Sequence, residues 1–226
     1  MAFATSTFRS GGQRIRLEIT RAVQPGPRPA VLLLHGADGL ARGDHYRLGA
    51  GLLAGAGYHT FLLHYLDRTG EVRAVYDNIK QNLPVWADTV RAGLERILAE
   101  RDVEPERLGI VGTSLGAALA FMVAAADQRV KAIVDCFGFM PEPVRMAAVR
   151  LPPTLVLHGA LDAIVPVQNA RAIVALLERL QTPHEVHIYP DQAHSFRGGA
   201  EIDALRRAAA FLQRHLQPVT PASTTC

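Results

Sequence analysis

The sequence predicts an α/β protein: a three-layer sandwich in which helices cover both faces of a mostly parallel sheet of about seven or eight strands. Short apolar runs bounded by glycine or proline alternate with longer stretches of helical periodicity, which is the pattern of βαβ units. An earlier run, residues 15–23, instead alternates apolar and polar residues. This alternation indicates a half-exposed antiparallel strand at the edge of the sheet.

The remaining elements follow in order along the chain. Further strands are predicted at residues 30–35, 59–65, 108–113, 131–137, 154–158 and 185–189. Helices are predicted between them at residues 44–56, 84–101, 115–126, 167–180 and 200–216. Pro84 is expected in the first turn of the second helix and Pro166 just before the fourth, where helices tolerate proline.

Composition predicts one domain that folds without covalent or metal support. The 226 residues contain no linker-like tract and are 49% hydrophobic, enough to bury a sizeable core. Residues 1–217 are therefore expected to form a single domain. The polar segment 218–226 is expected to be a disordered tail.

Charge and cysteine usage exclude several classes of function. The net charge of +3 is spread among nearly equal numbers of acids and bases, without the basic stripe that binds nucleic acid. Only Cys136 and Cys226 are present, too few for a disulfide framework, and no run reaches the ~20 apolar residues of a membrane span. We expect a cytoplasmic monomer or homodimer that binds neither nucleic acid nor membrane.

A nucleophile is predicted at Ser114. Residues 112–116, Gly-Thr-Ser-Leu-Gly, match G-x-S-x-G and lie between a predicted strand and a run of strong helix formers. A sharp strand-to-helix turn of this kind lifts the serine hydroxyl above the sheet. The Leu115 amide at the start of the helix is expected to face the oxyanion, with the Ala37 amide of the loop after residue 35 as the second donor.

The serine needs a base and an acid, which on this type of turn follow it in the order acid, then histidine. Asp162 lies just beyond the strand at 154–158, and His194 lies in the loop after the last strand. Asp135, at the end of the preceding strand, is an alternative acid, and Glu142 is a weaker one. The other histidines after Ser114, including His158, are interpreted as surface or core residues.

With these pieces in place, residues 28–216 resemble the dienelactone hydrolase family of the α/β-hydrolase superfamily. The resemblance rests on residues 86–121, on HGALDAIVP (158–166) and on YPDQAHSF (189–196). It implies a compact fold without a large cap domain. Two departures are clear: Ser114 stands where dienelactone hydrolase has a cysteine, and Gly36 stands where it has a glutamate.

The family binds a substrate carboxylate through arginines, which by resemblance points to Arg68 and Arg197 as substrate-binding residues, with solvated surface arginines as the alternative. The residues predicted to form apolar pocket walls include Phe139, Ile164 and Phe196.

These features together predict a serine hydrolase of small carboxylic esters or lactones that needs no metal or cofactor. A peptidase or acyltransferase on the same fold, and a non-catalytic ligand-binding homologue, remain alternatives.

Overall fold

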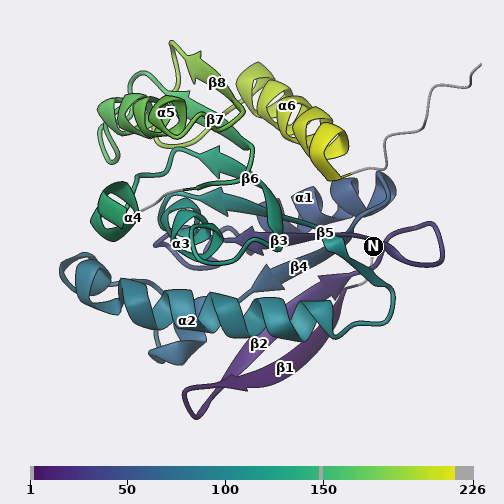
Figure 1. Cartoon of the computed structure of the whole chain (residues 1–226). Helices are drawn as coiled ribbons and strands as arrows, with labels where there is room; N and C mark the ends of the chain where they lie inside the picture. Colours follow the sequence, from purple (N-terminus) through teal and green to yellow (C-terminus); the bar gives the residue numbers. More distant parts are fainter. Residues whose placement is uncertain (1–2, 148–149, 217–226) are drawn as a thin grey trace, which may run out of the picture.

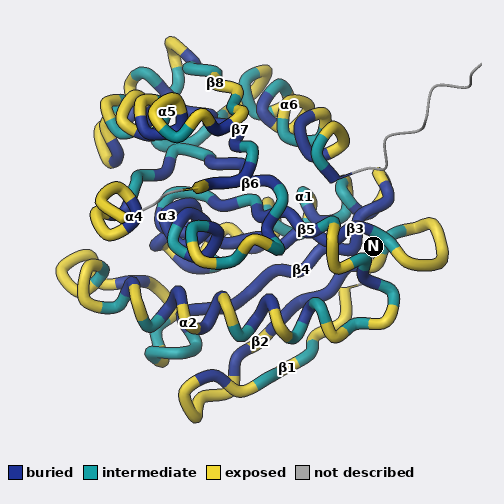
Figure 2. The backbone as a smooth tube through the Cα atoms, in the orientation of Figure 1, coloured by how far each residue is buried: buried dark blue, intermediate teal, exposed yellow. Residues whose placement is uncertain are grey.

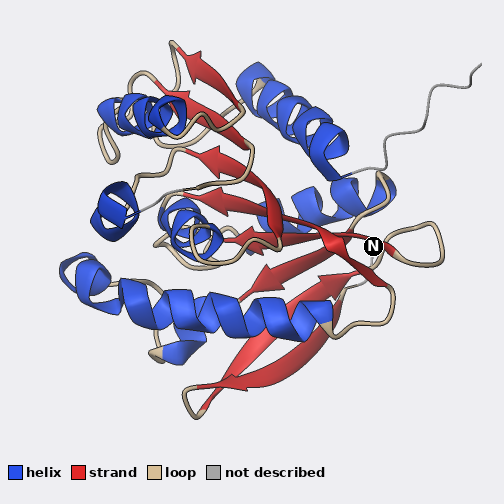
Figure 3. Cartoon of the chain, in the orientation of Figure 1, coloured by secondary structure: helices blue, strands red, loops and turns tan. Residues whose placement is uncertain are grey.

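The computed structural model describes residues 3–147 and 150–216 and is built around an eight-stranded sheet. The strand order is β1-β2-β4-β3-β5-β6-β7-β8, and the strands are the red arrows of Figure 3. β1 pairs antiparallel with β2 and β2 antiparallel with β4, whereas the other six strands run parallel. The predicted fold class is confirmed.

The bounds of the elements are as follows. The strands are β1 (Ala4–Ser10), β2 (Gln13–Thr20), β3 (Arg28–Leu34), β4 (His59–Leu63), β5 (Val103–Thr113), β6 (Val130–Cys136), β7 (Thr154–Gly159) and β8 (His184–Tyr189). The helices are α1 (Gly43–Gly55), α2 (Ile79–Leu98), α3 (Leu115–Ala124), α4 (Glu142–Ala147), α5 (Gln168–Arg179) and α6 (Gly199–Leu216), with short 3₁₀ helices η1 (Tyr65–Arg68) and η2 (Tyr76–Asn78).

Helices cover both faces of the sheet, as Figure 1 shows. α2, α3 and α5 pack on one face around a core that contains Trp86, Phe121 and Ile173. α1 and α6 pack on the other face, around a smaller core that contains Ala50 and Phe211. The central strands are buried along most of their length, which Figure 2 shows in dark blue, so their carboxyl ends are held rigidly.

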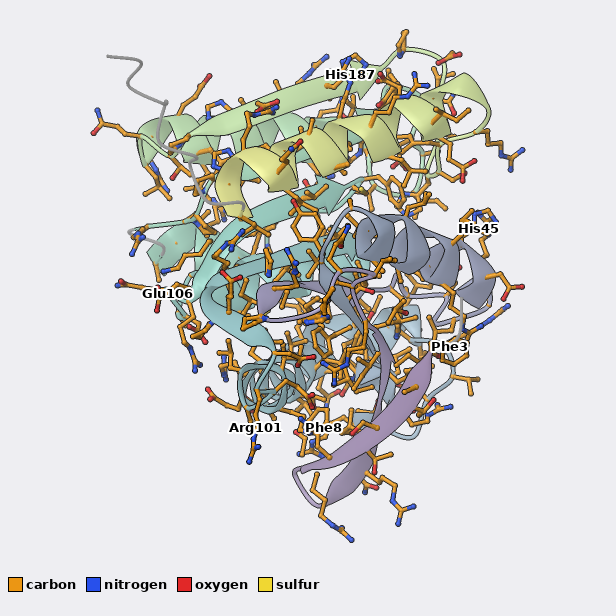
Figure 4. All side chains as sticks on the ribbon, turned by 90° about the vertical axis from the view of Figure 1, so that its right-hand side faces the viewer. Phe3, Phe8, His45, Arg101, Glu106 and His187 are labelled. Carbon is orange, nitrogen blue, oxygen red and sulfur yellow. The ribbon has the colours of Figure 1, made fainter. Side chains whose placement is uncertain are left out.

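α1 and α6 lie side by side on their face of the sheet, which Figure 4 views from the side. His45, labelled there on α1, lies 3.5 Å from a carboxylate oxygen of Glu201 at the start of α6. None of the helices within the described ranges is long and apolar enough to cross a bilayer.

The structure corrects two predictions about the N-terminal half. The strand expected at the sheet's edge is β2, and β1 lies outside it; β1 was missed because its sequence ATSTFRS has only two apolar residues. Pro84 lies inside α2 rather than in its first turn. The helix begins earlier because Ile79 and Leu83 already pack against the core, and tertiary packing stabilises helix ahead of the proline. The tail predicted at residues 218–226 lies outside the described residues.

Candidate active site

The turn between β5 and α3 places Ser114 in a strained backbone conformation. Its φ is 52° and its ψ is −116°, a region that residues with a side chain seldom adopt. The Ser114 amide donates to the Cys136 carbonyl at 2.9 Å, and the Ser114 carbonyl accepts from the Ala117 amide at 3.0 Å. These bonds to β6 and α3 hold the strained turn in place.

The two glycines of the motif are required by close packing. A Cβ at Gly112 would lie 2.5 Å from the backbone of Ala117. A Cβ at Gly116 would lie 2.6 Å from the carbonyl oxygen of His35, and closer still to that of Leu34. The turn therefore packs directly against the loop that follows β3.

Ser114, His194 and Asp162 form one chain of hydrogen bonds. Ser114 Oγ lies 3.0 Å from His194 Nε2, and His194 Nδ1 lies 2.7 Å from Asp162 Oδ2. Since a carboxylate only accepts, the proton of a neutral imidazole is on Nδ1, and Nε2 is left to accept from the serine hydroxyl. The arrangement orients an imidazole lone pair towards the hydroxyl.

The Asp162 carboxylate is buried and well supplied with donors. Its side chain has 0% exposure, and Oδ1 accepts from the amides of Ile164 at 2.9 Å and Val165 at 2.8 Å. These backbone donors stabilise the ionised form away from water and fix the plane of the carboxylate. Asp135, the alternative acid, instead accepts from the Gly138 amide at 2.9 Å.

The loops that carry the acid and the base are bonded to each other through their main chains. The Ala160 amide donates to Tyr189 at 2.8 Å, and the Leu161 amide donates to Gln192 at 2.9 Å. A Cβ at Gly159 would come within 2.6 Å of the Gln192 carbonyl carbon. The separation between Asp162 and His194 is thus set by backbone packing.

Aromatic rings surround His194, which is 18% exposed. The Phe137 ring contacts His194 edge-on with the centroids 4.9 Å apart, and contacts Phe196 at 5.2 Å. Phe196 and Phe139 are half-buried, whereas Ile164 is 58% exposed. Of the predicted apolar wall residues, Phe196 therefore lies nearest to the imidazole in this chain of contacts.

The loop after β3 lies against Ser114 and supplies the predicted oxyanion donor. A Cβ at Gly36 would be 3.6 Å from Ser114 Cβ. The Gly36 amide is already bonded to Tyr46 Oη, at 3.1 Å. The amides of Ala37 and Leu115 have no acceptor among the residues that the structure describes, so both donors are available to a substrate oxygen.

His35 shapes this loop as a neutral residue. It is buried, its Nδ1 donates to the Gly36 carbonyl at 2.9 Å, and its ring stacks on Tyr65 at 4.3 Å. Burial lowers the pKa of His35 to about 4. The Tyr65 hydroxyl donates to the His35 carbonyl at 2.8 Å, which fixes the start of the loop from below.

The two predicted substrate-binding arginines are not brought together. Arg68 follows β4, and its guanidinium packs against the turn between β1 and β2, where a Cβ at Gly11 would lie 2.5 Å from Arg68 Nε. Arg197 follows β8 and is exposed. Its amide donates to Gln192 Oε1 at 2.9 Å. β3, β5, β6 and β7 separate the two parent strands.

Sequence reasoning missed a charged cavity of about 350 Å³ beside the oxyanion loop. Its wall includes Asp38 and Arg73 together with two ion-paired groups. Arg16 forms two bonds with Asp67, at 2.9 and 2.6 Å. Pairing partners lie far apart along the chain, so no local sequence signal could have found them. Within residues 3–147 and 150–216, no group of three or more His, Cys, Asp or Glu could hold a metal ion.

A strained serine on a strand-to-helix turn, above a mostly parallel eight-stranded sheet, defines an α/β-hydrolase. The sequence model of the dienelactone hydrolase family matches residues 16–217. The chain belongs to the dienelactone hydrolase family, as the resemblance predicted.

Individual relatives are distant but extend over most of the chain. A Yersinia pestis protein that bears the name carboxymethylenebutenolidase is 24% identical over 208 residues, which covers 84% of this chain and 77% of that protein. The dienelactone hydrolase of Anabaena variabilis superposes with a TM-score of 0.78 at 22% identity, covering 96% of this chain and 99% of its own.

Two further solved structures show that the fold carries different named activities. A dienelactone hydrolase-like promiscuous phosphotriesterase from metagenomic libraries superposes with a TM-score of 0.82 at 19% identity, over 95% of this chain and 98% of its own. The Pyrococcus horikoshii acylaminoacyl peptidase has a TM-score of 0.82 at 16% identity, over 98% of this chain but 43% of the peptidase. At these identities the likeness shows the fold alone.

Proposed function

We propose that the protein is a serine hydrolase that cleaves small carboxylic esters or lactones through an acyl-enzyme intermediate. The observation that carries the proposal is the hydrogen-bond chain from Ser114 through His194 to Asp162, at 3.0 and 2.7 Å. The amides of Ala37 and Leu115, without acceptors of their own among the described residues, support it. Membership of the dienelactone hydrolase family agrees with hydrolysis in general.

Acylation begins when Ser114 Oγ attacks the carbonyl carbon and His194 Nε2 takes the hydroxyl proton. The carbonyl oxygen becomes an oxyanion, which the Ala37 and Leu115 amides stabilise by hydrogen bonds. When the tetrahedral intermediate collapses, the bond to the leaving alcohol breaks and His194 returns the proton to it. Asp162 remains ionised and stabilises the imidazolium.

Water then completes the turnover. It attacks the acyl-enzyme carbonyl while His194 takes one of its protons, and the acid product leaves as the proton returns to Ser114 Oγ. Every proton and nucleophile in this scheme comes from the chain, the substrate or water, so no metal or organic cofactor enters it. A lactone gives a single hydroxy-acid product because its alcohol stays attached to the acyl group.

The surroundings of Ser114 favour small substrates. The only helix between β6 and β7 in the described chain is α4, with six residues, so no large cap covers the serine. Phe139, Phe196 and Ile164 offer apolar surface for the acyl or alcohol group. Arg197 is exposed beside this surface in sequence and is the better placed of the two arginines to meet an acidic substituent.

The test is a panel of p-nitrophenyl acyl esters and lactones assayed with the wild type and with Ser114→Ala, His194→Ala and Asp162→Asn. We expect each of the first two variants to lower kcat by at least about 10³-fold, and Asp162→Asn by about 10⁴-fold. A fluorophosphonate probe should label the wild type and not Ser114→Ala. Near-normal turnover by Ser114→Ala, or no labelling of the wild type, would refute the proposal.

Peptide hydrolysis is a second candidate because the fold is shared with an acylaminoacyl peptidase. Since the chain spans less than half of that peptidase, its activity does not transfer with the fold. Adding peptide p-nitroanilides and a phosphotriester to the panel discriminates the candidates: esterase function predicts that kcat/KM is highest for the carboxylic esters or lactones.

A further inference from the structure

The carboxylate of Asp162 has a second imidazole beside it. His158 lies on β7, four residues before Asp162, and its side chain has 0% exposure. Its Nε2 is 2.8 Å from the Val165 carbonyl oxygen and 3.3 Å from Asp162 Oδ2. Oδ2 is also the oxygen that His194 Nδ1 approaches at 2.7 Å. One carboxylate oxygen therefore faces two histidines.

The surroundings of His158 fix its tautomer. Both groups at Nε2 are acceptors, so Nε2 carries the hydrogen and donates to them. The other nitrogen, Nδ1, is then a bare lone pair, and it is buried without a hydrogen-bond partner. Burial lowers the pKa of His158, which keeps the ring neutral at neutral pH.

An unpartnered buried nitrogen destabilises a fold. A leucine at this position would fill the space without that penalty, so the contribution of the imidazole is to be found at its other nitrogen. That nitrogen meets the acid of the hydrogen-bond chain to Ser114, which is the reason to assign His158 a role in the reaction.

We propose that His158 is a positioning residue that shares Asp162 Oδ2 with His194 and thereby holds the carboxylate in the ionised form and in the correct plane. The inference rests on the proposed function, because it acts only through the base of that mechanism. The Ile164 and Val165 amides hold Oδ1, and the two imidazoles hold Oδ2. With this set of donors Asp162 does not take the proton that His194 receives from Ser114.

The donor on Oδ2 also tempers the base. Part of the negative charge on Oδ2 is neutralised by the N–H of His158, so the carboxylate attracts a proton on His194 less strongly. Removal of that N–H should favour the protonated, inactive imidazole. The acid limb of the pH profile of kcat/KM should then move to higher pH.

Two substitutions separate the donor from the shape of the side chain. His158→Leu removes the N–H and fills the space, and we expect kcat to fall about 10- to 100-fold at unchanged KM, as for loss of one hydrogen bond to a charged group. His158→Gln places an amide N–H where Nε2 lies. It should keep kcat within about fivefold of the wild type and leave the acid limb unmoved.

A matched control is His59→Leu, which alters another buried histidine. His59 is 3% exposed, begins β4 and accepts from the Ala22 amide at 3.0 Å, remote from Ser114 in the fold. This variant should lower the melting temperature and leave kcat and the pH profile unchanged. It measures what the loss of a buried imidazole does to stability alone.

The outcomes are decisive. The proposal is overturned if His158→Leu matches the wild type in kcat and in the acid limb, or if His158→Gln loses as much activity as His158→Leu. If the leucine variant does not fold, His158→Asn, whose shorter amide does not reach Oδ2, takes its place with the same expectation. Failure of the proposed function shows separately, because the wild type would then neither hydrolyse esters nor react with a fluorophosphonate.

Discussion

The contact between Gly116 and the loop after β3 gives the sharpest test of how the site is assembled. In Gly116→Ala the new Cβ would lie 2.6 Å from the His35 carbonyl oxygen, whereas ordinary contact begins at 3.4 Å. The turn and the loop must therefore separate by about 0.8 Å, the difference of these distances. Both partners are backbone, so no flexible side chain can absorb the movement.

The separation should affect stability and catalysis together. Overpacking of this kind costs about 1–3 kcal/mol, which for a chain of this length lowers Tm by about 2–12 °C. The Ala37 amide is on the loop that moves and the Leu115 amide is on the turn. A misplacement of nearly 1 Å between the two oxyanion donors should lower kcat about 100-fold.

The assay combines thermal unfolding with p-nitrophenyl acetate hydrolysis. The matched control is Gly49→Ala in α1, where an added Cβ meets nothing within 4 Å. That variant should gain up to about 1 kcal/mol in stability and keep full activity. The packing argument is refuted if Gly116→Ala melts within about 1 °C of the wild type and keeps kcat within about twofold.

Further predictions concern buried titratable groups and the arginines. Burial raises the pKa of Asp135 from 3.8 to about 7. The free energy of unfolding should therefore fall by up to about 4 kcal/mol as pH rises from 4 to 7, and Asp135→Asn should flatten that fall. Burial lowers the pKa of His35 from 6.5 to about 4, so its contribution is lost as pH falls through this range, and His35→Phe should flatten the acid side. Arg68→Ala should lower Tm and leave kcat/KM unchanged, whereas Arg197→Ala should lower kcat/KM about fivefold for an anionic ester only.

Urea titrations between pH 4 and 8 measure the first two effects, and parallel stability curves for variant and wild type would contradict them. For the arginines, the comparison is between a neutral ester and one that bears a carboxylate. Equal losses on both esters in Arg197→Ala would argue against a substrate contact. A selective loss in Arg68→Ala would show that its guanidinium leaves the β1–β2 turn to meet the substrate.

The parts of the fold that the sequence predicted are those with strong local signals. The parallel strands are continuous apolar runs, and the turn at Ser114 has glycines at fixed offsets, so both were located closely. β1 has little apolar character because it stands at the edge of the sheet, and pairing with β2 is what makes it a strand.

Contacts between distant segments account for what was missed at the site. The approach of Gly159 to Gln192 and the pairing of Arg16 with Asp67 have no local pattern. Arg68 was placed after the correct strand, yet its side chain turns towards the N-terminal hairpin, which sequence position does not determine. His158 was interpreted as a surface or core residue, and only coordinates show that its Nε2 faces Asp162.

Main-chain bonds between the segments around Ala160, Leu161, Tyr189 and Gln192 have an evolutionary consequence. The spacing of acid and base depends on peptide groups that every residue except proline possesses. The apolar surface near the serine, in contrast, is built from replaceable side chains such as Phe139 and Phe196. Substrate preference can thus drift by single substitutions while the chemical machinery is inherited intact, which makes this scaffold suitable for directed evolution by randomising the rim alone.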